Sequence, residues 1–243
     1  MAEYFHIDYE FSPQKALERI DERIGKSPAA YIVVADGNVL VQVHRDLDYR
    51  TVVNGAMFSI CDSSYVPLYL KRLYGFKPEQ YCGSDIFRDI TEMKRYRMAF
   101  LGSSQEVLDA LRAKLTEVDP RIGEMPFVEL PFASADSFDY EAIAASLNES
   151  APDIVWVALG APKQEIFASR LAPLLRRGVI IPVGAVFNFR AGLGIARAPQ
   201  WMVRLHLEFL HRIFKEPRKQ LRRVWSIIRW TPAILRLERH SHR

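Results

Sequence analysis

Residues 152–165 read PDIVWVALGAPKQE, and this stretch decides the expected fold. Residues 153–159 form an apolar run rich in β-branched side chains, which predicts a buried strand. Gly160 permits a tight turn, and Pro162 suits the first turn of a helix because its missing N–H is not needed there. The stretch therefore predicts a strand that runs directly into a helix.

The same alternation extends to both sides of this stretch. Further strands are expected at residues 31–35, 57–61, 80–82, 97–101, 127–130 and 179–182. Helices are expected at residues 39–45, 49–56, 66–74, 86–94, 104–116, 138–150 and 162–177. This order predicts an α/β fold with a Rossmann-like, mostly parallel sheet and helices on both faces. Ligands of such sheets bind at the carboxyl ends of the strands.

The charge of the chain is unevenly distributed. The net charge is +4, but residues 201–243 hold eleven Lys and Arg against three Asp and Glu, or +8, which leaves about −4 for the first 200 residues. The strand–helix alternation also stops after about Gly194. We therefore expect an α/β catalytic domain at residues 1–195 and a basic, amphipathic helical appendage at residues 196–243.

The basic appendage predicts an anionic partner. Its aromatic and aliphatic residues are interleaved with arginines, which suits a helix that lies in the interface of an anionic membrane. The body shows no nucleic-acid motif, so nucleic acid is not expected as a partner. The apolar face could instead pack on the body or on a second copy of the chain, and the sequence leaves a homo-oligomer open.

Composition and segment lengths indicate a cytoplasmic protein, peripheral on the inner face of the membrane. No apolar run is long enough to span a bilayer, and residues 1–10 are acidic, unlike a signal peptide. Cys61 and Cys82 are expected to be small buried thiols. Neither a metal site nor a cofactor is expected, because the Asp-x-Asp pair at Asp46 and Asp48 lies between two helices, where a helix end and an N-cap are more typical.

Candidate site residues follow the predicted strands. Asp62 ends the strand at 57–61, where a carboxylate could act as a general base. The alternative is an N-cap for the helical segment that begins near Tyr65, and the residues alone leave the two readings even. After the strand at 97–101, Ser103 and Glu106 have the spacing of a capping box.

The first residues after Gly160 are also candidates. Lys163, Gln164 and Glu165 could hydrogen-bond a polyhydroxylated ligand, beside the free N–H groups of a helix start that favour an anion. The alternative is an ordinary turn with a solvated polar first turn, which these residues taken alone favour.

Taken together, these segments resemble the WecG/TagA/CpsF glycosyltransferases (glycosyltransferase family twenty-six). The resemblance is most specific in residues 152–165, in VGAVFNFRAG at 183–192, in the RAP-x-W pattern at 197–201, and in residues 207–212, 216–218 and 222–223. Before residue 153 it is looser, although GSD at 83–85 and GSSQE at 102–106 still fit.

The resemblance implies an inverting, metal-independent glycosyltransferase. It would move a sugar (HexNAc, HexNAc uronic acid or a related hexose) from a UDP-sugar to a polyprenyl-diphosphate-linked acceptor, in the synthesis of bacterial cell-surface polysaccharides such as capsules and exopolysaccharides. Asp62 would be the catalytic base. The acceptor side would hold Asp36, Asn38 and Asp85. The UDP-sugar would be bound by Gly102, Ser103, Phe132, Gly160, Lys163, Gln164, Glu165, Asn188, Arg197, Arg212, Arg218 and Arg222.

Within that set, arginines would bind the diphosphate in place of a metal, since a guanidinium meets phosphate oxygens bidentately. Phe132 could stack on the uracil base, although packing on the core explains a loop aromatic equally well, and Asn188 would offer an amide edge to the uridine.

The chain also departs from the family pattern. It has Cys61-Asp62-Ser63 where the family usually has Pro-Asp-Gly, Val34-Ala35-Asp36 where it has Thr-x-Asn, and Gln80 where an Arg is frequent. These changes bear on sugar and acceptor recognition more than on fold. The alternative they raise is a non-catalytic binding protein of the same fold.

Overall fold

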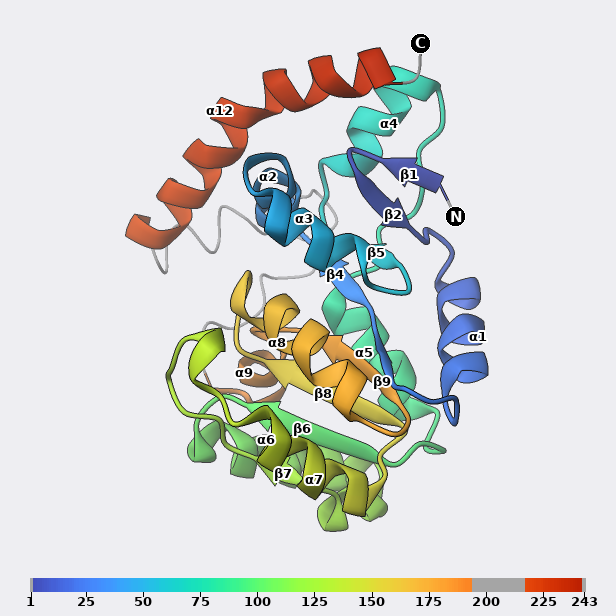
Figure 1. The fold of residues 1–243 in the computed structure, drawn as a ribbon, viewed down its shortest axis with the longest axis vertical. Coiled ribbons are helices and arrows are strands. Elements are labelled where there is room, and N and C mark those ends of the chain that lie inside the picture. The colour runs from blue at the N-terminus through green and yellow to red at the C-terminus, as the bar shows by residue number, and fades with distance from the viewer. Residues whose placement is uncertain (1, 194–216, 242–243) are drawn as a thin grey trace.

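The computed structural model describes residues 2–193 and 217–241 as a mixed α/β protein with two sheets (Figure 1). The larger sheet has five parallel strands in the order β3-β9-β8-β6-β7, with bounds Ala30–Tyr31, Val179–Pro182, Ile154–Ala158, Met98–Gly102 and Phe127–Val128. The smaller sheet has the order β1-β2-β5-β4, with bounds Ala2–Tyr4, Ile7–Tyr9, Ser59–Cys61 and Val33–Ala35. Its β1–β2 hairpin is antiparallel and its other pairs are parallel. The predicted α/β class is confirmed.

The strand expected at residues 31–35 is shared between the two sheets. Its first part, β3, pairs with β9, and its second part, β4, pairs with β5. All five residues are buried, and Ile32, which lies between the two strands, is 0% exposed. The run therefore joins the two sheets through the protein core, where a single sheet was expected.

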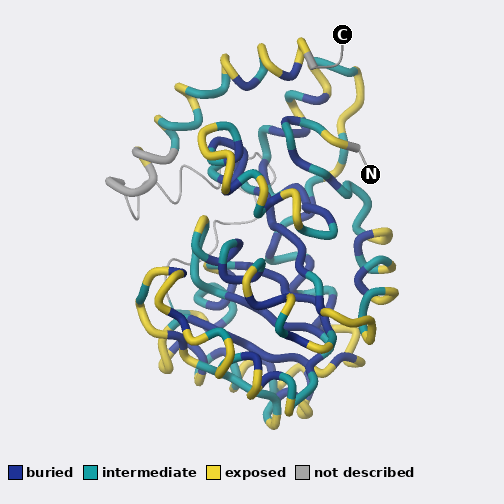
Figure 2. Tube along the Cα trace, in the orientation of Figure 1, coloured by how far each residue is buried: buried dark blue, intermediate teal, exposed yellow. Residues whose placement is uncertain are grey.

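Alternate residues of the central strand β8 face opposite layers of helices. Val155 and Val157 belong to one core cluster together with residues of α7 and α8, whereas Ile154 and Trp156 belong to a second cluster with residues of α5, α6 and α9. The Trp156 ring lies 4.7 Å from the ring of Phe87 on α5. Figure 2 shows the sheets as the buried centre of the molecule. A strand buried on both faces needs such cover, and helices on both faces are confirmed.

The helices follow the strands in the expected order. Their bounds are Pro13–Arg23 (α1), Gly37–Arg45 (α2), Leu47–Asn54 (α3), Val66–Tyr74 (α4), Gly83–Glu92 (α5), Gln105–Val118 (α6), Tyr140–Ser150 (α7), Lys163–Leu171 (α8), Val186–Ala191 (α9) and Pro217–Ser241 (α12), with 3-10 turns at Pro120–Glu124, Ala135–Ser137 and Ala172–Leu174. The predictions at 66–74 and 179–182 match α4 and β9 to the residue.

Several segments differ from the sequence-based expectation. Residues 80–82 do not form a strand: Tyr81 N donates one hydrogen bond to Cys61 O (3.0 Å), and α5 begins immediately afterwards. The helix expected at 162–177 ends at Leu171, because Pro173 lacks the N–H that would continue it. Strands β1 and β2 and helices α1 and α9 were not predicted.

Helix α12 lies along the half of the molecule that contains α2 and α4 (Figure 1). Ile234 is 1% exposed, and the Thr231 and Tyr69 hydroxyl oxygens are 3.2 Å apart. Ile227 Cδ1 packs so closely over Gly37 that a Cβ there would lie 2.9 Å away. The predicted C-terminal helix is thus present, while the proposed boundary near residue 195 lies outside the described residues. Within the described ranges, no helix combines the length and apolar character needed to cross a bilayer.

A buried carboxylate fixes the far end of α12. Glu238 is 4% exposed; its Oε2 accepts from Phe5 N (2.7 Å) and its Oε1 accepts from the Tyr74 hydroxyl (2.9 Å). Phe5 and His6 form the tight turn between β1 and β2, with φ of 56° and 59°. The Glu238 carboxylate accepts the hydrogen bond of the Phe5 backbone N–H in this turn. The last turns of the chain are therefore tied to its first residues.

We expect Glu238→Gln to lower the free energy of unfolding by about 1–3 kcal/mol, because the amide keeps only one of the two acceptor oxygens and loses the charge that strengthens both bonds. Urea denaturation of the full chain measures the loss. Arg236→Gln, an exposed change on the same helix, is the control. Equal midpoints for the two variants would contradict the prediction.

Candidate functional site

Two carboxylates lie side by side at the carboxyl ends of β4 and β5. The parallel register pairs Val34 with Ile60 and Ala35 with Cys61, so Asp36 and Asp62 each occupy the next position on neighbouring strands. Asp62 N also donates to Ala35 O (3.1 Å), which holds the two strand ends together. The edge expected to bind ligands thus presents a pair of acidic side chains.

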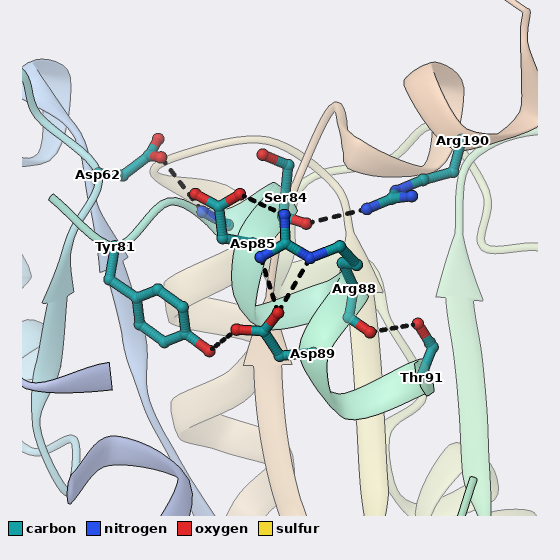
Figure 3. A network of polar contacts seen from close by, with 9 residues as sticks. Asp62, Tyr81, Ser84, Asp85, Arg88, Asp89, Thr91 and Arg190 are labelled. Carbon is teal, nitrogen blue, oxygen red and sulfur yellow. Dashed lines mark hydrogen bonds and ion pairs between the residues drawn. The ribbon is translucent and has the colours of Figure 1, made fainter. Parts of the chain in front are cut away.

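Asp62 faces the start of helix α5 (Figure 3). Its Oδ1 accepts from Gly83 N at 3.2 Å, and its backbone oxygen accepts from Gln80 Nε2 at 2.9 Å. The alternative reading, an N-cap for the helix that follows Tyr65, is wrong, because Tyr65 N donates to Ser63 Oγ instead (3.3 Å). The bonds from Gly83 and Gln80 hold Asp62 at the N-terminus of α5 as a half-buried acceptor of hydrogen bonds.

The first turns of α5 are fixed by an ionic network (Figure 3). Arg88 pairs with Asp85 (3.3 Å) and with Asp89 (2.8 Å), and Asp89 also accepts from the Tyr81 hydroxyl (2.9 Å). Burial, together with the bond to Asp89, raises the pKa of Tyr81 above its ordinary value, so this hydroxyl stays protonated as a donor. The network places Asp85 on the same helix end that faces Asp62.

Arg190 joins this helix end to α9, the helix that follows strand β9. It lies on α9, and its guanidinium donates to Ser84 O at 3.2 Å (Figure 3). The sequence reasoning did not single out Arg190, although it stands inside the quoted segment 183–192. Its position after strand β9 could have indicated it as a candidate, since ligands of such sheets bind at the carboxyl ends of the strands.

Asp36 begins helix α2. Its Oδ1 accepts from Asn38 N (2.8 Å) and from Val39 N (2.9 Å), which is an N-cap. Asn38, the other expected acceptor-side residue in this loop, therefore lies within the first turn of α2. Both are half-buried and lie at the strand end next to Asp62.

The ends of β6 and β8 approach each other through a glycine. Gly102 pairs with Ala158 and has φ +98°, and a Cβ there would lie 2.7 Å from Ala158 O, so a side chain is excluded. Ser103 also has positive φ, at 66°. Helix α6 begins after Ser104, whose side chain makes no capping bond within the described structure, so the expected capping box from Ser103 to Glu106 is wrong.

The turn from β8 into α8 is held by side chains of its own helix. Gln164 Oε1 accepts from Gly160 N (3.0 Å), and Gln164 Nε2 donates to Glu165 Oε1 (2.9 Å). Gln164 is 6% exposed and Glu165 is 0% exposed. Burial, with a smaller contribution from the charge of Asp36, raises the pKa of Glu165 from 4.5 to about 7.

Tyr49, from α3, faces the same carboxyl and was missed by the sequence reasoning. Its hydroxyl is buried and interacts with the Glu165 carboxyl, although neither this hydroxyl nor Glu165 Oε2 makes a hydrogen bond of good geometry within residues 2–193 and 217–241. Burial and the nearby Glu165 charge raise the pKa of Tyr49 above its ordinary value. No sequence pattern could have revealed this contact, because it joins residues far apart in the chain.

An exposed aromatic and a lysine flank the same turn. Phe132 protrudes fully into solvent, and Lys163 Nζ lies 5.0 Å from its ring centre. Lys163 Nζ also donates to Ala133 O (3.1 Å), which ties the loop after β7 to the start of α8. Packing of Phe132 on the core, one of the two readings left open, is therefore wrong, and its ring is available for stacking.

The remaining residues that were expected to bind the UDP-sugar differ in how far the structure describes them. Asn188 lies on α9 and is half-buried. Arg197 and Arg212 fall outside the described residues. Arg218 and Arg222 lie on α12, which is described there as backbone only. Their roles stay predictions.

Acidic side chains elsewhere serve as helix caps. Asp46 Oδ1 accepts from Tyr49 N (3.0 Å) between α2 and α3, which confirms the expected helix end and N-cap.

Among the described residues, no group of three or more His, Cys, Asp and Glu side chains could hold a metal ion. Cys61 is buried, Cys82 is half-buried, and the two do not form a disulfide bond.

Comparison with known proteins matches the sequence of this chain to one family. The sequence model for the glycosyl transferase WecG/TagA/CpsF family matches residues 5–243. The chain is 28% identical over 222 residues to the N-acetylglucosaminyldiphosphoundecaprenol N-acetyl-beta-D-mannosaminyltransferase of Bacillus spizizenii strain W23, covering 90% of this chain and 83% of that protein. To the protein of the same name from Bacillus subtilis strain 168 it is 26% identical over 227 residues, covering 91% and 84%.

Proposed function

The chain belongs to the WecG/TagA/CpsF family of glycosyl transferases, and from this premise we propose that it moves a sugar from a UDP-sugar to a polyprenyl-diphosphate-linked saccharide. The two Bacillus relatives are named as N-acetyl-beta-D-mannosaminyltransferases acting on N-acetylglucosaminyldiphosphoundecaprenol, which supports a HexNAc donor and an acceptor of this lipid-linked class. The product would enter a bacterial cell-surface polysaccharide.

The observation that carries the proposal is the position of Asp62. Its carboxylate lies at a strand end, beside Asp36 and at the start of α5. In the proposed single displacement, an acceptor hydroxyl oxygen bonds to the anomeric carbon as the bond to the UDP oxygen breaks. Asp62 takes the hydroxyl proton, and the configuration inverts.

The donor would bind along the ends of β6 and β8 and against α9. Uracil would stack on Phe132 next to Lys163, with Asn188 offering its amide. The diphosphate would lie near Gly102, Ser103 and Gly160, close to the starts of α6 and α8, where a helix N-terminus favours anions. Arg197, Arg212, Arg218 and Arg222 would neutralise the leaving diphosphate without a metal.

The experiment that tests the activity measures UDP release from UDP-N-acetylmannosamine by the full chain, in the presence of an undecaprenyl-diphosphate N-acetylglucosamine acceptor. Release that depends on both substrates, with a disaccharide-lipid product, is expected. Binding of UDP-sugars without turnover of any UDP-HexNAc or UDP-HexNAc uronic acid would favour the alternative of a non-catalytic protein of the same fold.

We also propose that α12 attaches the enzyme to an anionic membrane at the cytoplasmic face. Its outer surface exposes Leu221, Trp225 and Ile228, at 54%, 64% and 65%, and the Arg229 guanidinium lies 5.5 Å from the Trp225 ring centre. Exposed apolar side chains beside cations suit the interface of a bilayer.

We expect the double change of Trp225→Ser and Ile228→Ser to abolish flotation of the full chain with vesicles that contain 30% phosphatidylglycerol. Each lost apolar side chain removes roughly 1.5–3 kcal/mol of burial in the interface. Val118→Ser, at an exposed apolar position on α6, is the control and should float like the unmodified chain. Retained flotation of the double variant would show that α12 does not provide the attachment.

A further inference from the structure

Two consecutive hydrogen bonds link Glu165, in the protein core, through Gln164 to Gly160, in the turn after β8. The carboxyl of Glu165 accepts from the amide of Gln164 (2.9 Å), and that amide accepts from Gly160 N (3.0 Å). Gln164 Oε1 also lies 3.2 Å from the place that a Cβ on Gly184 would take, in the loop after β9. The Gln164 side chain therefore fills the space between the two strand-end loops.

The direction of the Gln164 amide depends on Glu165. A side-chain amide has a donor end and an acceptor end, and Gly160 N–H needs the acceptor end. If the amide turned over, its NH₂ would face the Gly160 N–H and both donors would lose their partners. Because Glu165 Oε1 is an acceptor, it selects the orientation in which Gln164 Oε1 meets Gly160.

Stability alone does not account for a carboxyl at this position. Glu165 is 0% exposed, its Oε2 makes no hydrogen bond of good geometry within the described residues although the Tyr49 hydroxyl faces the carboxyl, and the charge of Asp36 is unfavourable to its ionisation. Burying a partly satisfied carboxyl is unfavourable, and an uncharged acceptor would fill the same space at lower cost. Such sites are typical of groups that serve a binding geometry.

We propose that Glu165 is a positioning residue of the donor site: through Gln164 it fixes the backbone of Gly160 in the orientation that receives the nucleotide-sugar. The assignment rests on the proposed function. The sequence predicted a direct contact between Glu165 and the UDP-sugar. We assign Glu165 an indirect role instead, because it lies beneath the turn and Gln164 separates it from Gly160. Gly160 itself has φ +79°, and no atom lies within 4 Å of the position that a Cβ would take, so a ligand could approach the backbone on that side.

The test compares two substitutions at Glu165 in the full chain. Glu165→Met keeps the length and removes the acceptor, and it should raise the KM for the UDP-sugar by roughly 5–10-fold, the effect of one lost hydrogen bond, with kcat within about twofold. Glu165→Gln keeps an acceptor oxygen and should restore the KM to within about twofold of the unmodified chain. A purely structural role would lower the active fraction, and hence kcat, without this split.

Gln164→Leu provides a second route, should Glu165→Met not fold. It should raise the same KM by a similar factor, and adding Glu165→Met to it should change the KM no further, because the two side chains act in series. Additive effects of the two changes would overturn the proposal, and so would a Glu165→Met variant with an unchanged KM. Absence of transfer by the unmodified chain would instead count against the proposed function, and UDP binding measured by calorimetry on the same variants would still test the positioning role.

Discussion

Asp62→Asn is expected to lower kcat for sugar transfer by about 10²–10⁴-fold, the contribution of a positioned general base. The asparagine keeps a carbonyl oxygen that can accept from Gly83 N, as Asp62 Oδ1 does at 3.2 Å, so the start of α5 should stay in place. What the variant loses is the basicity of the carboxylate. The KM for the UDP-sugar should therefore change little, because the donor is bound by other residues.

Single-turnover transfer assays with lipid-linked acceptor measure this effect, since they separate the chemical step from product release. Asp48→Asn, an exposed aspartate in the first turn of α3, is the matched control and should retain full activity. A transfer rate within tenfold of the unmodified chain for Asp62→Asn would exclude Asp62 as the base. Attention would then move to Asp36, on the neighbouring strand end.

The order of elements could be predicted wherever an apolar run was long or a helix carried its own stop signals. Helix α4 has Pro67 in its first turn and Gly75 at its end, with φ +78°, and its bounds were predicted to the residue. By contrast, the β1–β2 hairpin turns at Phe5 and His6, which have φ of 56° and 59° without the Asn or Gly that usually mark such turns. Its three-residue strands carry too few positions to show alternation.

Pairing between distant segments could not be predicted from local patterns. The run at residues 31–35 was identified as strand, but its division between two sheets depends on β9 and β5, far away in sequence. Asp62 was placed correctly at a strand end, whereas the helix it caps begins 21 residues later, at Gly83. A cap formed across such a distance leaves no spacing rule in the sequence.

Burial of polar residues was the other feature that the sequence concealed. Lys, Gln and Glu at the start of α8 have the pattern of a solvated first turn, yet Gln164 and Glu165 are buried beneath it. The reason is that α3 packs against α8 and places Tyr49 over the carboxyl. A ligand contact was therefore a reasonable expectation for Glu165, and only the packing of α3 indicates an indirect role.

Glu165→Gln is expected to make the folded protein more stable at pH 8, by about 3 kcal/mol, and to leave its stability nearly unchanged at pH 4. Burial raises the pKa of Glu165 from 4.5 to about 7 in the folded state. Below pH 4.5 the residue is protonated in both states and contributes no difference. Between pH 4.5 and 7 the unfolded chain releases its proton first, so the unfolded state is favoured and stability falls as pH rises. Above pH 7 the penalty is constant, and a pKa raised from 4.5 to about 7 corresponds to about 3 kcal/mol, since each tenfold change in proton affinity is roughly 1.4 kcal/mol.

Denaturant unfolding of both proteins at pH 4, 6 and 8 measures the difference directly. Glu149→Gln, at an exposed position on α7, supplies the control for the loss of one negative charge and should show no such trend. A difference that stays flat across this range would mean that the pKa of Glu165 is the same in the folded and unfolded states, so that its neighbours compensate for the effect of burial. Suppose that Glu165→Gln gains stability and retains the KM for the UDP-sugar, while Glu165→Met raises this KM. Glu165 then acts as a hydrogen-bond acceptor for Gln164, and its negative charge only lowers the stability of the folded protein. The position then needs an oxygen facing Gln164, and the carboxylate form of that oxygen is dispensable for binding.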